Sequence, residues 1–285
     1  MKDVTNAMRA HILTAAVPYI KQYTDQYVVV KYGGNAMIDE ELKKTVMKDL
    51  MLLQLVGVKV VLVHGGGPAI NSTLDAMKIE SHFANGLRVT DEATMDVVQM
   101  VLAGKVNKGL VADLTDLGGK AVGLCGVDGN MIQVHKQNDE LGYVGSIDTI
   151  DTSIIDDVIS RGYIPVISSI GMGADGKTYN INADTVAAKI AGALKAETMV
   201  AMTNIDGVLR DVHDPSSLIS KITMAEADQL KADGIIAGGM IPKVDCCLEA
   251  IKSGAQKVFI INGEIPHAIL IELLTDEGLG TMFVK

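Results

Sequence analysis

Two lysines beside glycine pairs are the residues of this sequence best suited to phosphate chemistry. Lys31 precedes Gly33 and Gly34, and Lys243 lies four residues after another glycine pair. Glycines allow backbone N–H groups to approach phosphate oxygens closely, and a lysine adds a point charge. A phosphoryl group in transfer carries charge on its equatorial oxygens, so its transfer is assisted mainly by cations and N–H donors. If folding brings Lys31 and Lys243 to one centre, phosphoryl transfer is the chemistry they suit.

A glycine triplet forms another candidate anion cradle. Gly65, Gly66 and Gly67 follow a short apolar run and precede Pro68. Proline favours the first position of a helix, where free N–H groups and the positive end of the helix dipole attract an anion. Pro242 marks a similar helix start after the glycine pair that precedes the second lysine. The triplet does not fit the dinucleotide pattern G-x-G-x-x-G, and ordinary turn glycines remain the alternative.

Several polar residues have a functional and an ordinary interpretation. Asn182 and Asp184 stand where a helix should begin, and capping alone would account for both. Asp184 could also orient lysines around a transferred group. Asn180 could hydrogen-bond a carboxylate or amide of a substrate, and Arg88 could clamp a carboxylate with two parallel bonds or be a surface charge. His64 is interpreted as a strand-end histidine and is kept out of the chemistry.

Residues 171–178 offer an alternative phosphate site, because they fit the pattern G-x-x-x-x-G-K-[ST]. That pattern binds phosphate only where its lysine, here Lys177, opens a helix. An aspartate–glycine turn pair precedes Lys177, and residues 178–181 are expected to be extended, with a helix starting only near residue 182. We therefore expect no phosphate loop here. A P-loop nucleotide hydrolase, which would require Lys177, is the alternative that a lysine variant can test.

Alternation of short β-branched runs with helical periodicity predicts an α/β fold with a mainly parallel sheet. The expected strands are Tyr27–Tyr32, Lys59–His64, Ile164–Ser168, Thr198–Thr203 and residues 257–261. The expected helices cover residues 39–55, 68–77, 91–117, 183–194 and 242–253. Residues 79–90 and 119–151 break this rhythm. Their turn pairs, Asn85-Gly86 and Asp128-Gly129, predict antiparallel additions near the sheet edge.

Residues 1–25 are expected to form a separate N-terminal helix. One stripe of this helix is apolar: Val4, Met8, Ile12, Ala15 and Ala16. Pro18 should kink or end it. An isolated helix is marginal in water, so this one must pack on its own domain or on a neighbouring subunit, and the sequence leaves both open. The remaining chain is expected to form an N-lobe at 26–194 and a C-lobe at 195–285.

Composition restricts the possible partners and compartments. A formal charge of −10 argues against a nucleic-acid surface, which needs clustered lysine and arginine. No apolar run reaches the roughly 20 residues that cross a bilayer, and residues 12–20 lack the pattern of a signal peptide. The cysteines, Cys125, Cys246 and Cys247, have no disulfide or zinc spacing. A soluble cytoplasmic protein is expected.

Five motifs in order resemble the acetylglutamate kinases of the amino-acid-kinase family. They are Lys31-Tyr32-Gly33-Gly34-Asn35, His64-Gly65-Gly66-Gly67-Pro68, Gly86-Leu87-Arg88-Val89-Thr90, Asn180-Ile181-Asn182-Ala183-Asp184 and Gly239-Met240-Ile241-Pro242-Lys243. The resemblance covers nearly the whole chain from residue 27. It implies a three-layer αβα sandwich of two lobes around a mainly parallel sheet.

The resemblance also implies residue roles. Lys31 and Lys243 would stabilise the transition state, and Asp184 would position them. The residues that would bind N-acetyl-L-glutamate are Gly66, Gly67, Arg88 and Asn180; those that would bind phosphate are Gly33, Gly34 and Gly65. The N-lobe would hold the acid and the C-lobe ATP, with Asn204 and Asp206 facing the nucleotide. Mg²⁺ would bridge the β- and γ-phosphates without a direct protein ligand.

Regulation is implied by the same resemblance. The family acts in arginine biosynthesis, and some of its members are inhibited by arginine. Those members resemble this chain in carrying a helix before the first strand. They assemble through that helix as hexamers, which are trimers of dimers. Candidate arginine contacts are Glu264, Glu272, Thr275 and Gly280. Related kinases acting on aspartate, glutamate, carbamate or a nucleoside monophosphate are alternatives, and so is a silent amino-acid sensor. Docking of a signalling protein is left open.

Overall fold

The computed structural model describes residues 5–84 and 86–285, so Val4 and Asn85 lie outside the described residues. Its centre is an eight-stranded sheet in the order β12-β14-β13-β11-β1-β2-β8-β5. The strands are β1 (Tyr27–Tyr32), β2 (Lys59–His64), β5 (Ala121–Cys125), β8 (Ile164–Ser168), β11 (Thr198–Thr203), β12 (Lys221–Thr223), β13 (Lys257–Asn262) and β14 (Thr281–Val284). Neighbours run parallel except β13 and β14. The mainly parallel sheet is thus confirmed.

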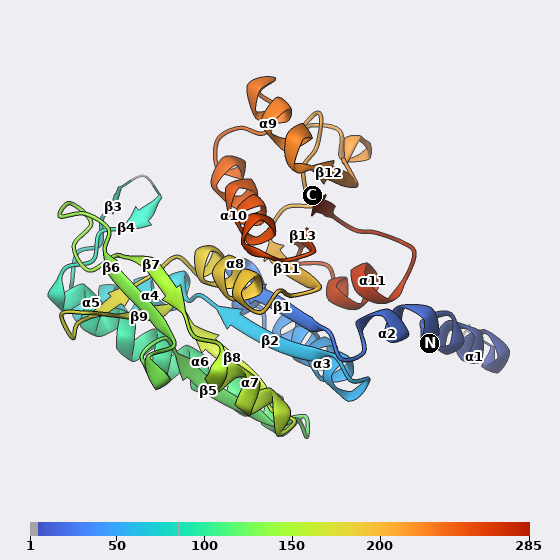
Figure 1. Ribbon diagram of the computed structural model, residues 1–285, viewed down its shortest axis with the longest axis horizontal. Coiled ribbons are helices and arrows are strands. Elements are labelled where there is room, and N and C mark those ends of the chain that lie inside the picture. The colour runs from blue at the N-terminus through green and yellow to red at the C-terminus, as the bar shows by residue number, and fades with distance from the viewer. Residues whose placement is uncertain (1–4, 85) are drawn as a thin grey trace.

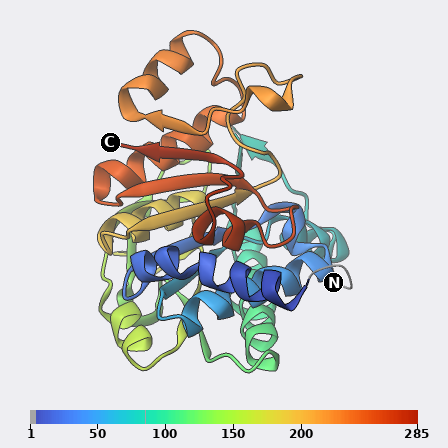
Figure 2. The same ribbon diagram turned by 90° about the vertical axis from the view of Figure 1, so that its right-hand side faces the viewer.

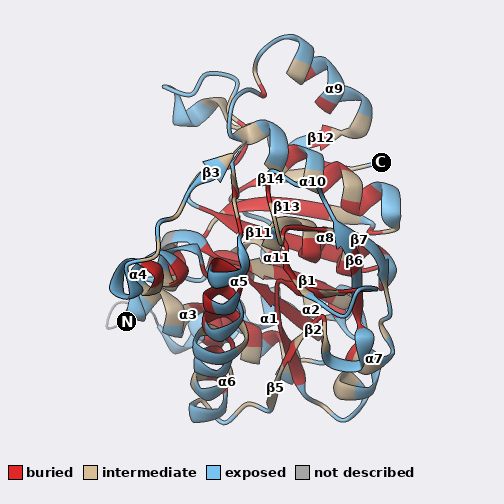
Figure 3. Cartoon of the chain, turned by 90° about the vertical axis from the view of Figure 1, so that its left-hand side faces the viewer, coloured by how far each residue is buried: buried red, intermediate tan, exposed pale blue. Residues whose placement is uncertain are grey.

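Helices cover both faces of this sheet (Figure 1). On one face lie α7 (Ser153–Ser160), α8 (Ala183–Ala193) and α10 (Met240–Ser253), and on the other α2 (Val17–Tyr23), α3 (Glu40–Leu55), α6 (Asn107–Asp116) and α11 (Ala268–Leu274). Strand alternation divides the core between them, because Val29 packs with the first group and Val28 and Val30 with the second. The expected αβα sandwich is confirmed (Figures 2 and 3).

Smaller elements lie beside the two layers. They are a four-stranded sheet of β6 (Ile132–Lys136), β7 (Gly145–Ile150), β9 (Ile170–Gly173) and β10 (Thr178–Asn180), a ribbon of β3 (Phe83–Ala84) and β4 (Leu87–Arg88), α4 (Gly67–Met77), α5 (Glu92–Gln99), a π-helix (Met100–Val106), α9 (Met224–Ala232) and short 3₁₀ turns at Gly34–Met37, Asp128–Asn130 and Pro215–Ser217. The ribbon and the β6–β7 pair are the antiparallel additions that the sequence predicts.

Parallel pairing explains where the functional turns meet. Tyr32 of β1 lies beside His64 of β2, so the glycine-rich turns that follow these residues emerge together at one sheet edge. Open α/β sheets bind ligands at this carboxyl edge. The register also places Lys31 between Val63 and Ala201, with its strand in the middle of the sheet.

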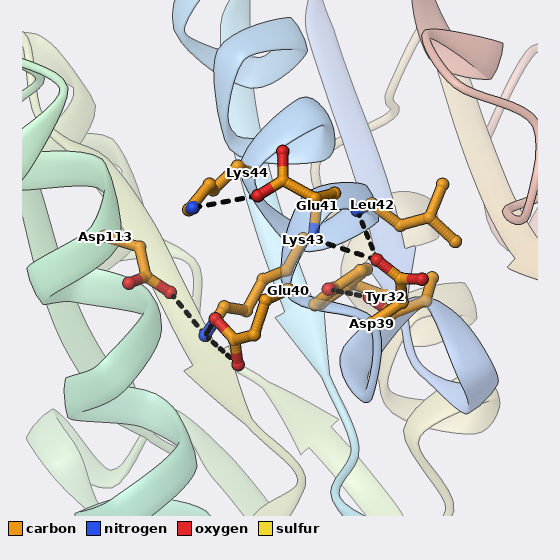
Figure 4. A network of polar contacts seen from close by, with 9 residues as sticks. Tyr32, Asp39, Glu40, Glu41, Leu42, Lys43, Lys44 and Asp113 are labelled. Carbon is orange, nitrogen blue, oxygen red and sulfur yellow. Dashed lines mark hydrogen bonds and ion pairs between the residues drawn. The ribbon is translucent and has the colours of Figure 1, made fainter.

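A polar network anchors the turn after β1 (Figure 4). The Tyr32 hydroxyl donates to the Ala36 carbonyl at 2.5 Å, and Asp39 caps α3 by accepting from the N–H groups of the second and third residues after it. Lys43 Nζ lies 2.9 Å from Glu40 and 3.2 Å from Asp113 of α6. These contacts connect the first glycine turn to the helices behind it.

The N-terminal segment forms two helices rather than one. Pro18 lies in the first turn of α2, and α1 (Asn6–Ala15) ends just before it, as the sequence predicts. No residue of α1 is buried, and it extends away from the other elements in Figure 1. Met8 is 53% and Leu13 74% exposed. Its apolar side chains therefore do not pack on its own domain.

Several predicted boundaries are wrong in informative ways. Pro242 is the third residue of α10 rather than the first, a position where its missing N–H still costs no intrahelical bond. Helix α4 likewise starts at Gly67, one residue before Pro68. Strand β5 joins the main sheet in parallel, and Asp128-Gly129 forms a 3₁₀ turn between sheets instead of a hairpin. Within residues 5–84 and 86–285, no helix has the length and apolar character needed to span a bilayer.

Candidate active site

Two adjoining cavities open at the carboxyl edge of the sheet. The first, of about 290 Å³, is lined by the two glycine turns, the β3–β4 ribbon and the start of α8. The second, of about 570 Å³, lies between β7, α8 and the start of α10. Asn182 and Asp184 line both. The two cavities therefore adjoin at the N-terminus of α8.

Lys31 and Asp184 form an ion pair at this junction. Lys31 Nζ lies 3.0 Å from Asp184 Oδ1, and the two side chains are 11% and 21% exposed. Asn182 caps α8 by accepting from the Asp184 N–H at 2.8 Å, which is the capping the sequence predicts. A β-carbon at Gly33 would lie 3.2 Å from Lys31 Nζ, so glycine leaves this ammonium group room at the cavity wall.

Lys243 lines the second cavity from the first turn of α10. No described residue forms an ion pair with it, whereas Lys189, also at this cavity, is neutralised by Glu249 at 2.6 Å. Sequence reasoning missed Lys189, because it lies inside a regular helix with no glycine turn beside it. The two predicted lysines thus reach adjoining cavities that share Asp184 as a common wall.

The glycine triplet supplies unequal donors. The Gly65 N–H donates to the Tyr32 carbonyl at 3.2 Å, so it is not free for a phosphate. Gly66 is the N-cap of α4, and no described residue accepts from the N–H of Gly66 or Gly67. Both residues line the first cavity with Gly34, whose φ of 71° lies in the left-handed region. The cradle is therefore built from the last two glycines of the triplet.

Arg88 enters the first cavity from the β3–β4 ribbon and is 7% exposed. It donates to Asn71 Oδ1 at 2.6 Å and to the Ser81 hydroxyl, and its guanidinium lies 4.7 Å from the centre of the Phe83 ring. Burial lowers the pKa of Arg88 from its ordinary value. Sequence reasoning missed Asn71 and Ser81, which fix the guanidinium, because each lies in an otherwise unremarkable segment.

Asn180 lines the same cavity at the end of β10. Its side chain donates to Thr90 Oγ1 at 3.3 Å, and Thr90 Oγ1 donates to the Arg88 carbonyl at 2.9 Å. Its N–H donates to the Tyr143 carbonyl at 2.8 Å. A chain of hydrogen bonds therefore joins the amide of Asn180 to the backbone of the ribbon that carries Arg88.

The profile of the amino acid kinase family matches residues 26–262. The chain belongs to the amino acid kinase family. The acetylglutamate kinase of Brachyspira hyodysenteriae is 52% identical over 287 residues, covering 100% of both chains. That of Clostridium kluyveri (strain ATCC 8527) is 54% identical over 275 residues, covering 96% of this chain and 97% of that one.

The fold of this chain is also similar to that of a solved structure. The N-acetylglutamate synthase from Neisseria gonorrhoeae, in complex with coenzyme A and N-acetyl-glutamate, is 27% identical with a TM-score of 0.84. The match covers 97% of this chain but 63% of the synthase, so this chain spans less than two thirds of that protein. The two acetylglutamate kinases named above, in contrast, match this chain over 96% or more of both lengths. This member of the amino acid kinase family is therefore a kinase.

Two groups of residues implied by the family resemblance line neither cavity: those expected to face the nucleotide, Asn204 and Asp206, and the candidate arginine contacts. Asp206 Oδ1 accepts from Asn262 Nδ2 at 2.8 Å, and neither Asp206 nor Asn204 lines a cavity described above. Glu272 accepts from the N–H groups of Leu279 and Gly280, and burial raises the pKa of its carboxyl.

The other candidate arginine contacts lie nearby. Thr275 donates to the Ile271 carbonyl at 2.7 Å. A β-carbon at Gly280 would lie 2.1 Å from the Ile260 carbonyl, and the Glu264 N–H donates to Asn262 at 2.9 Å. These contacts organise the segment around α11, and the roles of its residues toward arginine stay predictions.

The alternative phosphate pattern does not form a phosphate loop. Lys177 lies in the β9–β10 hairpin rather than at a helix start. Its ammonium donates to the Tyr143 hydroxyl at 3.0 Å and lies 5.1 Å from that ring's centre. Residues 178–180 are extended, as the sequence predicts.

Lys177→Ala is expected to leave the kinase turnover of this chain within about two-fold of the parent, since an exposed contact of this kind is worth less than ~1 kcal/mol. Steady-state kinetics at saturating substrates measure it. A loss of turnover as large as that of a Lys31 variant would instead restore the P-loop hypothesis.

Proposed function

We propose that this chain transfers the γ-phosphoryl group of ATP to the side-chain carboxylate of N-acetyl-L-glutamate in the cytoplasm, as a step of arginine biosynthesis. One observation carries the proposal: the first cavity combines a guanidinium suited to clamping a carboxylate, Arg88, and an amide, Asn180, with the Lys31–Asp184 pair. A substrate with a carboxylate and an acetamido group offers partners for both. The relatives named above support the same substrate.

The acid would lie in the first cavity and ATP in the second. Arg88 would hold the α-carboxylate, and Asn180 the acetamido group, which leaves the side-chain carboxylate directed at the junction. One carboxylate oxygen then attacks the γ-phosphorus in line, while the bond between that phosphorus and its bridging oxygen to the β-phosphate breaks. The products are an acyl phosphate and ADP. The nucleophile is already an anion, so this step requires no general base.

Charge stabilisation would come from both lobes, because residues 26–194 would hold the acid and residues 195–285 contribute the start of α10, with Lys243, to the cavity proposed for the nucleotide. Lys31 and Lys243 would neutralise the equatorial oxygens from two sides, and Asp184 would keep Lys31 in place. The N–H groups of Gly66 and Gly67 would bind the oxygens as they gain charge. These donors are preorganised, because the strands and helix termini hold them in place before the reaction begins.

Mg²⁺ would enter this site together with the nucleotide. Among the described residues, no cluster of three or more His, Cys, Asp or Glu side chains could hold a metal ion. Mg²⁺ commonly takes most of its ligands from phosphate and water. With the nucleotide, it would supply positive charge beside the leaving group, and Lys31 and Lys243 would neutralise the transferred phosphoryl group.

Hydroxylamine trapping of the acyl phosphate tests the proposed function. The purified chain is incubated with ATP, Mg²⁺ and one acceptor at a time: N-acetyl-L-glutamate, L-glutamate, L-aspartate, carbamate or a nucleoside monophosphate. We expect hydroxamate and ADP in equal amounts with N-acetyl-L-glutamate, and little with L-glutamate, which lacks the acetyl group. Equal or faster turnover of another acceptor would replace this substrate. ATP binding without turnover of any acceptor would favour a silent sensor.

We also propose that arginine inhibits this chain and that the chain assembles as a hexamer. The support is α1, whose apolar residues are solvent-exposed: Ile12 is 57% and Leu13 74% exposed, with no buried neighbour in that helix. Pairing two such helices from neighbouring dimers would bury these side chains and close a ring of three dimers. Arginine would bind between this helix and the segment around α11.

Removal of residues 1–15 is expected to abolish arginine inhibition and convert the hexamer to dimers, with kcat kept within about two-fold because the cavities lie elsewhere. This deletion spares α2, where Tyr23 is 3% exposed and belongs to the core. Leu13→Asp is the matched point variant, and Lys21→Ala a control on α2. Light scattering and inhibition curves with arginine measure both effects. Unchanged inhibition in the shortened chain would refute the regulatory proposal.

A further inference from the structure

His64, the last residue of β2, is fully buried and contacted at both ring nitrogens. Its exposure is 0%, and it lines neither cavity. Nδ1 lies 2.9 Å from the Gly65 carbonyl oxygen, and Nε2 lies 3.1 Å from Asn107 Nδ2. Burial lowers the pKa of His64 to about 4. At neutral pH the ring is therefore uncharged, with a proton on one nitrogen and a lone pair on the other.

Asn107 and the Gly65 carbonyl together determine which nitrogen carries that proton. Its Nδ2 lies 2.8 Å from the Val166 carbonyl and 3.3 Å from the Leu124 carbonyl, while its Oδ1 accepts from Lys108 Nζ at 3.2 Å. Turning the amide over would place its oxygen against two carbonyl oxygens. The NH₂ group must therefore lie on the side of His64, and since it can only donate, Nε2 presents its lone pair to it rather than a proton. The proton lies on Nδ1 and is donated to the Gly65 carbonyl.

That hydrogen bond orients the peptide between Gly65 and Gly66. The carbonyl and the N–H of a trans peptide point to opposite sides. A Gly65 carbonyl turned toward the buried ring therefore directs the Gly66 N–H away from it, on the side of the first cavity that Gly66 lines. Glycine has no side chain to hold its φ and ψ, so this peptide would otherwise turn easily.

The chain around Asn107 also supports the glycine turn from behind. Asn107 follows directly on the π-helix Met100–Val106, a rare conformation that is frequent at functional sites. A β-carbon at Gly66 would lie 2.6 Å from Leu102 and 3.4 Å from Val106, so these side chains already contact the glycine backbone. Asn107 is 1% exposed. One segment thus supplies both the packing behind Gly66 and the amide that holds His64.

We propose that His64 is a positioning residue, which fixes the Gly65–Gly66 peptide so that the Gly66 N–H faces the transferred phosphoryl group, and that Asn107 reinforces the tautomer of His64 that carries its proton on Nδ1. The kinetic part rests on the proposed function. The positioning part is a statement about one peptide and one ring, and it can be measured without any substrate.

Two substitutions separate the two ring nitrogens. In His64→Asn the side-chain amide reaches the position of Nδ1 and can still donate to the Gly65 carbonyl. In His64→Gln the amide extends to the position of Nε2, so it meets Asn107 but no longer reaches that carbonyl. We expect His64→Asn to keep kcat within about three-fold of the parent. His64→Gln should lower kcat at least roughly ten-fold, but by less than the 10²–10³-fold loss that is typical when an oxyanion donor is deleted. KM for ATP should change little in either variant.

Asn107→Leu adds a second test. This change removes the partner of Nε2 and leaves only the Gly65 carbonyl to favour the proton on Nδ1, so it should lower kcat several-fold in the parent. In the His64→Asn background the same change should lower kcat no further, because the new amide donates to Gly65 without help from Asn107. Thermal unfolding of all variants separates lost stability from lost turnover.

Nitrogen-15 spectra of the histidine rings test the geometry in the unaltered full chain. His64 is assigned as the signal missing in His64→Asn, and at pH 7 it should be neutral with the proton on Nδ1. A proton on Nε2 would overturn the inference, even if a variant failed to fold. It would also be overturned if His64→Asn and His64→Gln lowered kcat equally. Absence of turnover in the parent would instead contradict the proposed function and leave the ring measurement decisive for the positioning role.

Discussion

Lys243→Ala is expected to lower kcat by about 10²–10³-fold, the range seen when one preorganised donor to a transition state is removed. KM for ATP and for the acid should change less than about five-fold, because a cation that matters chiefly in the transition state affects the rate more than ground-state binding. Lys243 is the better lysine for this test, since no described residue forms an ion pair with it. Its removal leaves no unpaired carboxylate behind.

A matched control lies on the same helix. Lys252 belongs to the last turn of α10 and is exposed, so Lys252→Ala changes the same charge without reaching either cavity. Its kcat should stay within about two-fold of the parent. Lys31→Ala should lose at least as much turnover as Lys243→Ala, with some loss of stability because Asp184 loses its cation. A fall in kcat of less than ten-fold in Lys243→Ala would contradict the proposed role of Lys243.

The elements that hold the site could be predicted because their signals are local. β-Branched runs such as Lys59–His64 end at glycines, and the parallel arrangement then places consecutive turns at one edge. Asn182 likewise caps α8 through a contact two residues away. Local signals also rejected the alternative phosphate pattern, since the turn before Lys177 leaves no helix for it to open.

The residues that orient the site could not be predicted, because their contacts are distant in sequence. Asn71 is seventeen residues from the arginine it fixes, and Asn107 is forty-three residues from His64. Each lies in a helix whose periodicity explains it without any function. The π-helix before Asn107 was also missed, since residues 91–117 read as one continuous helix. His64 lines neither cavity, and its contact with Gly65 becomes visible only in the fold.

Arg88→Ala is expected to raise KM for the acid roughly 10- to 150-fold, which corresponds to the ~1.5–3 kcal/mol of a charged hydrogen bond. The loss should appear in KM, with kcat within about five-fold, because Arg88 would bind the end of the substrate that does not react. Arg88→Lys should recover little of it. A lysine keeps the charge but has no planar fork for two parallel bonds and no flat face for the Phe83 ring.

Asn71→Ala gives a graded version of the same experiment, because it removes the acceptor at 2.6 Å while the guanidinium remains. Its KM for the acid should rise less than that of Arg88→Ala. In the double variant, Asn71→Ala should add almost nothing, since its effect would pass through Arg88. Initial rates over a matrix of acid and ATP concentrations measure all four proteins. A fall in kcat at unchanged KM in Arg88→Ala would place this arginine at the reacting end instead, and would reverse the substrate's orientation in the first cavity.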